Sequence, residues 1–556
     1  MNTRIKTFFA TYIGIIWALF VALIALLCWF AFRSDLELSQ FFSSDSLYLQ
    51  ALYRDFFQDG YAFLEGWRLN QAANIFPDMF LFFILNAILG NFTTATFFYS
   101  VIQYFTIIYL MYLIFRQIKH NLHISTFAPA IYLFVSFLFL FFIDRSWISS
   151  LLNHNAWHNS AYIMALLCIY LFYKYLNHKS KKVLIAIIVL SMLSGACDKL
   201  FFICFTLPVS LVIIVLYFFN KDRKTLIKSL IIITIGALLG IALWIFFKNN
   251  PYFSLTKPYG EFTLYHIKES WVTFSEQIRG YLTEPSFIMV LSYFSILSYI
   301  ATVIYVFIKT FRLIKEKKSY DNMYVFQLFV LFFTPIVLFT PILAGSYDNS
   351  ISLRYNYFPY LLLPFNSVVL ISSWLNKNKL VKITLNTTLS LLMIGYLLFH
   401  YPLQELSKGL NNFIHFYPER AKIVDSCFTD ENFKYGITDD YWAARQVTMF
   451  SKKGIRMYCT FAGGDPWLHV SNKYWFTDNN KGKHAHCEFT FFLWSKDKDV
   501  PDFFKENNDL QPIDLDNWNL YHVAPYRFII PGVRFAIDPI LIDTSHKNNL
   551  HLSTDY

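Results

Sequence analysis

The stretch from residue 8 to residue 32 reads FFATYIGIIWALFVALIALLCWFAF and carries no charge, and the next stretch, 33–60, reads RSDLELSQFFSSDSLYLQALYRDFFQDG. At about 1.5 Å per residue, the first stretch forms a helix long enough to cross roughly 30 Å of hydrocarbon. The sequence CWFAFR at its end lacks the small-residue pattern of a signal-peptide cleavage site, so we expect this helix to remain as an anchor. An acid-rich loop therefore follows directly after the first membrane span.

The composition indicates a membrane protein with many spans. Of 556 residues, 56% are hydrophobic and only 15% are charged, and the chain contains 62 Phe and 37 Tyr. A soluble protein with a single core does not tolerate this proportion of apolar side chains. Apolar runs and loop charges together predict about eleven transmembrane helices. They are expected near residues 8–32, 94–115, 124–143, 159–176, 183–197, 200–219, 225–247, 287–311, 322–343, 356–374 and 381–400.

The formal net charge of +10 is explained by topology. Basic side chains cluster in alternate loops, for example at 174–182, 221–228 and 309–318. A surplus of Lys and Arg marks loops that face the cytoplasm. This places the N-terminus inside the cell, and it places loop 33–93 and the tail from residue 401 onward on the exported side. Because the surplus follows the topology, it excludes a nucleic-acid partner.

We divide the chain into a transmembrane domain, residues 1–400, and an exported α/β domain, residues 401–556. Within the first domain, loop 33–93 contains two apolar pieces, near 47–57 and 75–89, that are too short to span and carry carboxylates. We expect both to form helices along the membrane surface. Hydropathy falls after residue 400 and turn residues multiply. A strand near 433–437, a helix near 441–450 and a strand near 455–460 are expected there.

The exported loop carries acids that are candidates for catalysis. Asp45 lies in the sequence Ser44-Asp45-Ser46-Leu47-Tyr48, and we expect Asp55 and Asp59 to follow on the same short helix. A carboxylate here can act as the general base on a hydroxyl group, or help to hold a divalent cation. Alternatively, these acids are solvated groups of an exported loop.

The architecture and several short motifs resemble the C-type fold of glycosyltransferases that use polyprenyl-phosphate-linked sugars. The similarity covers roughly residues 1–400 and includes the N-terminal span, the acidic exported loop and its two juxtamembrane helices. The matching motifs are Asp45-Ser-Leu-Tyr48, Phe76-Pro-Asp78, and Leu353-Arg-Tyr355 followed by Pro359 and Pro364.

The resemblance implies a lipid-phosphate-linked sugar donor, inversion at the anomeric carbon, and an acceptor that is an envelope glycan, a lipid or a protein. The family's first-loop acid maps to Asp45, which would deprotonate the acceptor hydroxyl. Tyr48 and Asp78 map to substrate-binding positions. The family often has a second acid directly after the first, but Ser46 stands there in this chain. A requirement for Mg²⁺ or Mn²⁺ therefore stays open, and Asp55, Asp59 or Asp78 would supply any second carboxylate.

The leaving polyprenyl phosphate needs fixed cations near the membrane surface. Arg354 is the first candidate, because a guanidinium can bind two phosphate oxygens at once. Lys199 is the second. Alternatively, Arg354 anchors the chain at the interface and Lys199 pairs with its neighbour Asp198.

Two histidines form a further candidate cluster in Asn153-His154-Asn155-Ala156-Trp157-His158. His154 and His158 are four residues apart, so they share one face if the segment is helical, which would suit a metal ion or a phosphate. The alternative is hydrogen bonding to a sugar or to the backbone of the loop. In the tail, exposed aromatic residues of the motifs Tyr441-Trp442, Pro466-Trp467 and Tyr474-Trp475-Phe476 suit stacking on sugar rings, with core packing as the alternative for Trp442 and Trp475.

Two other functions fit a chain of this class. A transporter or flippase of lipid-linked sugars would favour charges in the middle of spans and internal symmetry. A surface-polysaccharide polymerase or ligase would place its catalytic groups in a large late loop, for which residues 248–285 are the candidate. Most charges here lie at span ends, so we favour the glycosyltransferase. The Lys- and Phe-rich composition points to a bacterial cytoplasmic membrane.

Overall fold

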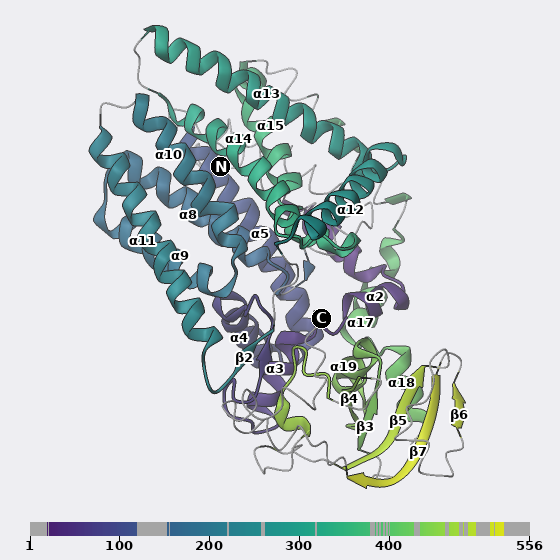
Figure 1. Ribbon diagram of the computed structural model, residues 1–556. Helices are drawn as coiled ribbons and strands as arrows, with labels where there is room; N and C mark the ends of the chain where they lie inside the picture. The colour runs from purple at the N-terminus through teal and green to yellow at the C-terminus, as the bar shows by residue number, and fades with distance from the viewer. Residues whose placement is uncertain are drawn as a thin grey trace, which may run out of the picture.

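The computed structural model of the protein is mostly helical, with a five-stranded sheet beyond one end of the helices (Figure 1). It describes residues 19–118 except 21, 153–219 except 155, 222–256, 262–316, 320–377, 401–427, 434–461, 466–476, 488–495, 512–515 and 518–527, together with scattered positions between 384 and 399 and residue 482.

Long apolar helices form the main body of the molecule. Six stretches of the described chain are long and apolar enough to cross a membrane, at Phe92–Ile118, Asn159–His178, Phe202–Phe219, Arg223–Lys248, Ile288–Glu316 and Asn322–Leu343. The protein is therefore a helical membrane protein. The span expected at 124–143 lies outside the described residues, and most of the span expected at 381–400 does so as well. The helices of this body are α5 (Phe92–Ile118), α8 (Asn159–His178), α9 (Lys181–Cys197), α10 (Leu207–Phe219), α11 (Arg223–Lys248), α13 (Phe287–Glu316), α14 (Asn322–Leu343) and α15 (Pro359–Lys377).

The loops that we expect in the cytoplasm meet at one end of this body. Lys179 forms an ion pair with Asp222, whose side chain also caps the N-terminus of α11 by accepting from the Thr225 N–H. Asp321 caps α14 in the same way and lies 2.9 Å from the ammonium of Lys309. Side-chain oxygens at a helix N-terminus satisfy backbone N–H groups that have no partner inside the helix. Asp222 and Asp321 therefore cap helices that begin at this end, and each also forms an ion pair with a lysine of a neighbouring segment.

Helices α9 and α11 pack closely because α11 presents two glycines to α9. A Cβ atom added to Gly236 would lie 2.8 Å from Cβ of Ser191, and one added to Gly240 would lie 3.1 Å from the Ser191 carbonyl oxygen. Small residues four apart let two helices approach to backbone contact inside a membrane. Figure 1 shows the two helices side by side. Residues 198–199 form the turn after α9, so they lie at the opposite end of this helix from the Lys179–Asp222 pair.

The first loop forms several short elements. Helix α2 (Asp35–Phe41) begins with a capping box between Ser34 and Glu37. A turn over residues 43–47 then leads to α3 (Tyr48–Phe57). A π-helical turn, η1 (Ile75–Met79), continues into α4 (Phe80–Leu89), which ends at Gly90 with a φ of 65°. Phe80, Ile84 and Ile88 on one face of α4 are exposed, as a helix lying against lipid requires.

The expectation that Asp45, Asp55 and Asp59 share one helix is wrong. Helix α3 begins at Tyr48 and its last turn closes at Gln58, whose N–H bonds to the carbonyl oxygen of Arg54. Only Asp55 is inside the helix, whereas Asp45 lies in the preceding turn and Asp59 follows the C-terminus. Gly60, with a φ of 76°, takes the chain away from the helix.

The tail forms an α/β unit whose sheet has the strand order β4-β3-β5-β7-β6. Strand β3 is parallel to β4 and β5, and β7 is antiparallel to both β5 and β6. The expected strand, helix and strand at the start of this unit agree with β3, α19 and β4 to within two residues at each end. The elements are α17 (Leu406–Ile414), α18 (Glu419–Cys427), β3 (Tyr435–Thr438), α19 (Tyr441–Phe450), β4 (Arg456–Cys459), β5 (Glu488–Ser495), β6 (Pro512–Leu515) and β7 (Trp518–Arg527).

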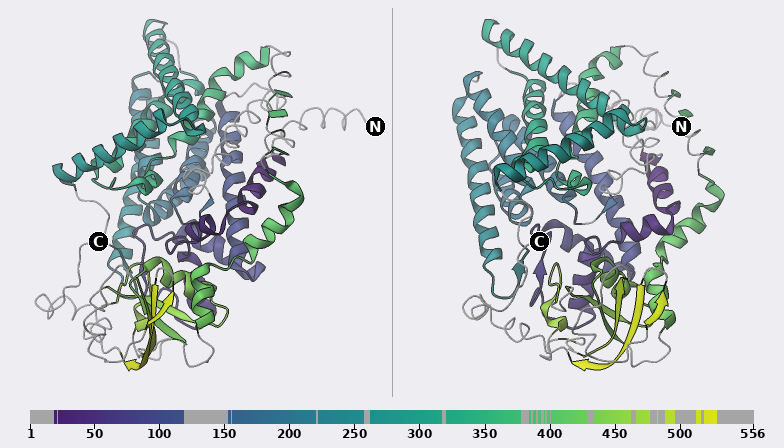
Figure 2. Two further views of the ribbon diagram at one scale, coloured as in Figure 1. Left: turned by 90° about the vertical axis from the view of Figure 1, so that its right-hand side faces the viewer. Right: turned by 45° about the vertical axis from the view of Figure 1, so that its right-hand side comes forward.

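The first loop and the tail share one hydrophobic core. Trp67 from the loop contacts Trp475 from the tail edge to face, with ring centroids 5.3 Å apart. The Lys473 N–H donates to the Gly66 carbonyl at 2.9 Å, and the Arg68 N–H donates to the Ser471 carbonyl at 2.8 Å. The same loop segment forms β1 (Arg68–Leu69), which pairs in parallel with β2 (Ser254–Leu255) after α11. Figure 2 shows these purple and green segments together at the end of the helices. The loop and the tail are one structural unit.

We predict that Gly236→Ala lowers the thermal midpoint of the protein in detergent. The added methyl group collides with Ser191, and overpacking of this kind costs about 1–3 kcal/mol. The matched control is Gly280→Ala in α12 (Leu264–Thr283), where the atom nearest to the added Cβ would be 3.7 Å away. This variant has the better helix propensity of Ala without a collision. Equal midpoints for the two variants would contradict the close packing of α9 on α11.

Candidate active site

A cavity of about 370 Å³ lies between the helical body and the tail unit. Every segment that lines it comes from a loop expected on the exported side, or from the helix ends next to such a loop. Its polar lining includes one carboxylate from the first loop, a lysine and an arginine, and two histidines. The lining residues are Asp45, Asn70, Gln71, Ala72, Ala156, Trp157, His158, Asp198, Lys199, Leu200, Ile203, Phe262, Thr340, Pro341, Ala344, Ser346, Arg354, Tyr355 and His469.

Asp45 is held at the cavity by the tail. The Tyr441 hydroxyl donates a hydrogen bond to Oδ1 of Asp45 at 3.1 Å, and the Ser44 hydroxyl donates to the Tyr441 carbonyl. Tyr441 is the first residue of α19, and the Asp440 side chain caps this helix by accepting from the N–H groups of Trp442 and Ala443. The N-terminus of α19 therefore fixes both the Tyr441 hydroxyl and the turn that carries Asp45.

His469 lines the cavity beside Asp45 as a neutral imidazole. Burial lowers its pKa to about 4, and the positive charges of Arg68, Arg445 and Arg354 act in the same direction, while Asp45 opposes them. Its ring meets the Tyr441 ring edge to face at 5.6 Å. At neutral pH this side chain adds hydrogen-bonding capacity to the site but no charge.

Arg354 approaches the cavity from a 3₁₀ turn, η4 (Ser350–Tyr355), just before α15. Its guanidinium donates to the Tyr355 hydroxyl at 2.8 Å and lies 5.6 Å from the centre of the Trp157 ring. Helix α15 starts at Pro359, which suits the first position of a helix because it has no N–H to leave unpaired. Aromatic rings thus orient a half-buried guanidinium at the cavity wall.

Lys199 occupies the turn between α9 and the segment that leads into α10. It lines the cavity, and its ammonium lies 3.7 Å from the centre of the Trp244 ring in α11. Burial lowers its pKa, and the neighbouring charge of Lys248 adds to this, whereas Asp198 has the opposite effect. A second cationic residue therefore lines the same cavity as Arg354.

His158 and Asp198 form a close pair that also lines the cavity. Nδ1 of His158 lies 2.6 Å from Oδ2 of Asp198, while Oδ1 of the same carboxylate accepts the Leu200 N–H at 3.0 Å. The His158 backbone is left-handed, with a φ of 69°. Non-glycine residues in this region are uncommon and gather at functional sites.

The expected pairing of the two histidines on one helix face is wrong, because α8 starts only at Asn159. His154 is buried away from the cavity and stacks between Phe41 and Trp157, at 4.5 and 4.6 Å. Its Nδ1 bonds with the Ser46 hydroxyl at 2.9 Å. Burial lowers the pKa of His154 to about 3, so it is neutral at neutral pH. These contacts hold the loop that carries His158.

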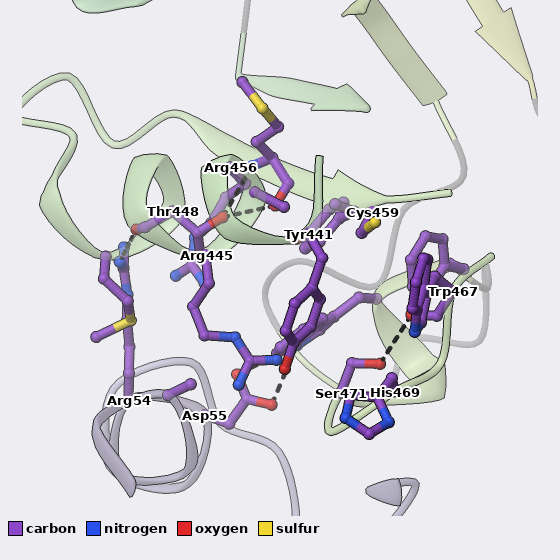
Figure 3. Close-up of a pocket in the computed structure, with 17 residues that line it drawn as sticks. Arg54, Asp55, Tyr441, Arg445, Thr448, Arg456, Cys459, Trp467, His469 and Ser471 are labelled. Carbon is purple, nitrogen blue, oxygen red and sulfur yellow. Dashed lines mark hydrogen bonds between the residues drawn. The ribbon is translucent and has the colours of Figure 1, made fainter. Parts of the chain in front are cut away.

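Asp55 lies outside the large cavity, in the contact between α3 and the tail. Its carboxylate accepts the indole N–H of Trp67 at 3.0 Å, the indole N–H of Trp475 at 3.1 Å and the Asn472 amide at 3.0 Å. Burial raises its pKa to about 7, although the hydrogen bonds from Asn472 and Trp475 oppose this. Asp55 also lines a separate pocket of about 20 Å³, roughly the space of one water molecule, between α3 and residues of α19 and β4 (Figure 3).

Asp59, Tyr48 and Asp78 also lie away from the large cavity. Asp59 forms a buried ion pair with Arg456 of β4, with 2.6 Å between Oδ2 and the guanidinium. Tyr48 donates to the Ala73 carbonyl inside the core that the loop shares with the tail. Asp78 accepts hydrogen bonds from the hydroxyls of Tyr99 and Ser160, and burial raises its pKa to about 6. These contacts connect parts of the fold and do not bring the three side chains to Asp45.

Within the described residues, no group of three or more His, Cys, Asp or Glu side chains is arranged to hold a metal ion. The carboxylate that lines the large cavity with Asp45 is Asp198, which is already bonded to His158. The second acid suggested for Asp55, Asp59 or Asp78 does not lie next to Asp45.

No protein-family model matches this sequence, and no curated protein is similar to it. The assignment of the site therefore depends on the chemistry and the geometry of its own residues.

Among the titratable side chains that line the cavity, Asp198, Tyr355 and His469 were not candidates from the sequence, and Tyr441, which lies outside the lining, was not expected as a partner of Asp45. The sequence did point to Asp198, because a carboxylate between two apolar runs needs a partner. It suggested the neighbouring Lys199 as that partner, whereas the structure pairs Asp198 with His158. Tyr355 belongs to the motif that contains Arg354. His469 had no signal, because its position depends on how the tail folds against the first loop.

We predict that Asp55→Asn lowers the thermal midpoint while Asp45→Asn does not. Asn at position 55 keeps one acceptor oxygen but turns an amide N–H₂ group toward N–H donors, which leaves buried groups unpaired at a cost of about 1–3 kcal/mol. Asn at position 45 still accepts from the Tyr441 hydroxyl. Thermal unfolding in detergent measures both. A midpoint that falls for Asp45→Asn and stays unchanged for Asp55→Asn would contradict this division of roles.

We also predict that His469 destabilises the folded protein in acid. Its pKa is near 4 when folded and near 6.5 when unfolded, so between these values the unfolded chain binds more protons and the free energy of unfolding falls as the pH decreases. His469→Gln removes this contribution. Between pH 7 and pH 4.5, the thermal midpoint of the wild type should therefore fall more than the midpoint of His469→Gln. Equal falls in the two proteins would refute the prediction.

Proposed function

We propose that this protein is a membrane glycosyltransferase that moves a sugar from a polyprenyl-phosphate donor to a hydroxyl group of a glycan, lipid or protein. One observation carries the proposal: Asp45, Lys199 and Arg354 line a single cavity at one end of an apolar helical body. A base for a hydroxyl and cations for a phosphate are the groups that this transfer needs. The C-type fold, with about eleven spans, is the arrangement that we propose for the helical body.

The positive-inside rule supports an exported site. The basic loops lie at the end of the body where Lys179 meets Asp222 and Lys309 meets Asp321. The cavity lies at the opposite end, so we propose that it opens on the exported face of a bacterial cytoplasmic membrane. Leu200, Ile203 and Phe262 give one part of its wall an apolar surface, which suits a prenyl chain that arrives from the bilayer.

In the proposed reaction, Asp45 accepts the proton of the acceptor hydroxyl. The oxygen attacks C1 of the donor sugar as the bond from C1 to the phosphate oxygen breaks, and the electron pair of that bond leaves with the polyprenyl phosphate. Attack from the side opposite to the leaving group inverts C1. Tyr441 holds the carboxylate in place, because its hydroxyl donates to Oδ1 and leaves Oδ2 available for the acceptor.

Arg354 and Lys199 meet the charge that develops on the phosphate. Removing one preorganised cationic or hydrogen-bonding group of this kind typically costs about 10²–10³ in rate. Contacts with aromatic rings orient both cations, since Arg354 lies beside the Trp157 and Tyr355 rings and the Lys199 ammonium lies over the Trp244 ring.

We predict that Asp45→Asn lowers transfer by about 10²–10⁴-fold, which is the range for loss of a general base. The assay measures release of polyprenyl phosphate from a panel of short-chain polyprenyl-phosphate sugars, with and without chelator and added Mg²⁺ or Mn²⁺. Asp35→Asn, at an exposed position in the same loop, is the control and should retain full activity. Arg354→Gln should raise the KM for the donor more than Arg354→Lys does.

Normal turnover by a well-folded Asp45→Asn variant would exclude the assigned base. Movement of the intact donor across a vesicle membrane without release of polyprenyl phosphate would instead favour a transporter.

A further inference from the structure

His158 and Asp198 form a hydrogen-bonded pair at the cavity that has no role in the action of the proposed base, Asp45. Both oxygens of Asp198 are engaged, one with Nδ1 of His158 at 2.6 Å and the other with the Leu200 N–H at 3.0 Å. A carboxylate on Nδ1 fixes the tautomer and the orientation of an imidazole and leaves Nε2 to exchange a proton with a substrate. His158 also lines the cavity, so this proton-transfer group faces the site.

Contacts and sequence adjacency link the pair to both candidate cations. The His158 ring contacts the Tyr355 ring at 5.3 Å, and the Tyr355 hydroxyl accepts from the Arg354 guanidinium at 2.8 Å. Asp198 directly precedes Lys199 in the turn after α9. His158 is thus connected to both candidate phosphate-binding cations, whereas Asp45 is held by Tyr441 from the tail.

We propose that His158, positioned by Asp198, is the general acid that protonates the leaving polyprenyl phosphate. This inference rests on the proposed function and adds a second catalytic residue with a partner to the site. His158 is the catalytic residue, since it faces the reacting atoms, and Asp198 is a positioning residue that acts through it.

The acceptor proton moves to Asp45, the new bond forms between the acceptor oxygen and C1, and the bond from C1 to the phosphate oxygen breaks. The electron pair stays on that oxygen, which takes the proton from Nε2 of His158. Polyprenyl phosphate leaves as a monoanion, and the enzyme holds a protonated Asp45 and a neutral His158. Proton exchange with solvent restores both groups.

Several charged or titratable groups surround His158. Asp198 contacts it directly, and Asp78 interacts with it through space behind the α8 N-terminus. The remaining titratable or charged groups on the cavity wall are Asp45, Lys199, Arg354, Tyr355 and His469.

The decisive experiment varies the leaving group. Two donors carry the same sugar and a prenyl chain of the same length, but one has fluorine on the second prenyl carbon, which withdraws electrons and makes the phosphate a better leaving group. General acid catalysis matters less for a better leaving group. His158→Asn suits the left-handed backbone at this position, because Asn tolerates positive φ better than most residues.

We expect His158→Asn to lower the kcat for the ordinary donor by about 10²–10⁴-fold and to recover a large part of that loss with the fluorinated donor. Asp198→Asn should show the same pattern with a smaller loss. Asp45→Asn, which removes the base, should lose the same factor with both donors. An equal loss with both donors in His158→Asn would overturn the inference.

A measurement on the wild type keeps the test independent of how the variants fold. The kcat of the wild type should fall at alkaline pH with the ordinary donor, because a general acid must carry its proton, and this limb should flatten with the fluorinated donor. The same alkaline limb with both donors would refute the acid role. Failure of the wild type to release polyprenyl phosphate from any donor would refute the proposed function itself, so the two failures are distinguishable.

Discussion

The buried carboxylates of the first loop hold the structure of the site together. Asp55 accepts N–H groups from Trp67 in its own loop and from Asn472 and Trp475 in the tail, and Asp59 pairs with Arg456 in β4. Removing one partner of a buried ion pair costs about 3–5 kcal/mol, because it leaves an uncompensated charge. These contacts join segments about 400 residues apart and hold the tail, which carries Tyr441 and His469, against the first loop.

This junction has a direct consequence for the chemistry. With the tail fixed on α3, helix α19 begins next to the turn that carries Asp45, and its first residue, Tyr441, bonds to the carboxylate. Three separate loops at the ends of the helical body bring His158, Lys199 and Arg354 to the same cavity. The cavity therefore combines Asp45, which the tail positions, with the cations Lys199 and Arg354, which loops at the helix ends supply. A transfer reaction that removes a proton and stabilises a developing anion needs both kinds of group.

Much of the architecture could be predicted from the sequence. The apolar runs that became α5, α8, α11 and α14 are long enough to be recognised by length alone, and the caps Asp222 and Asp321 mark where two of them begin. The start of the tail unit was also predicted, since its strands and α19 follow alternating and helical patterns. The placement of the three carboxylates of the first loop relative to α3 was not predicted. Asp45, Asp55 and Asp59 look equivalent along the chain, and only the bounds of α3 separate them.

The sequence by itself determined that this is a helical membrane protein whose loops alternate in charge. The thickness of the bilayer sets the length of each apolar span, and basic loops remain on the cytoplasmic side. It also provided the residue types of the site, including Asp45, Lys199 and Arg354. The tertiary structure alone decided which acid faces the cavity and that His158 pairs with Asp198, 40 residues away. The physical reason is that such partners are chosen by the packing of separate helices and of the tail, and no local pattern in the chain encodes that packing.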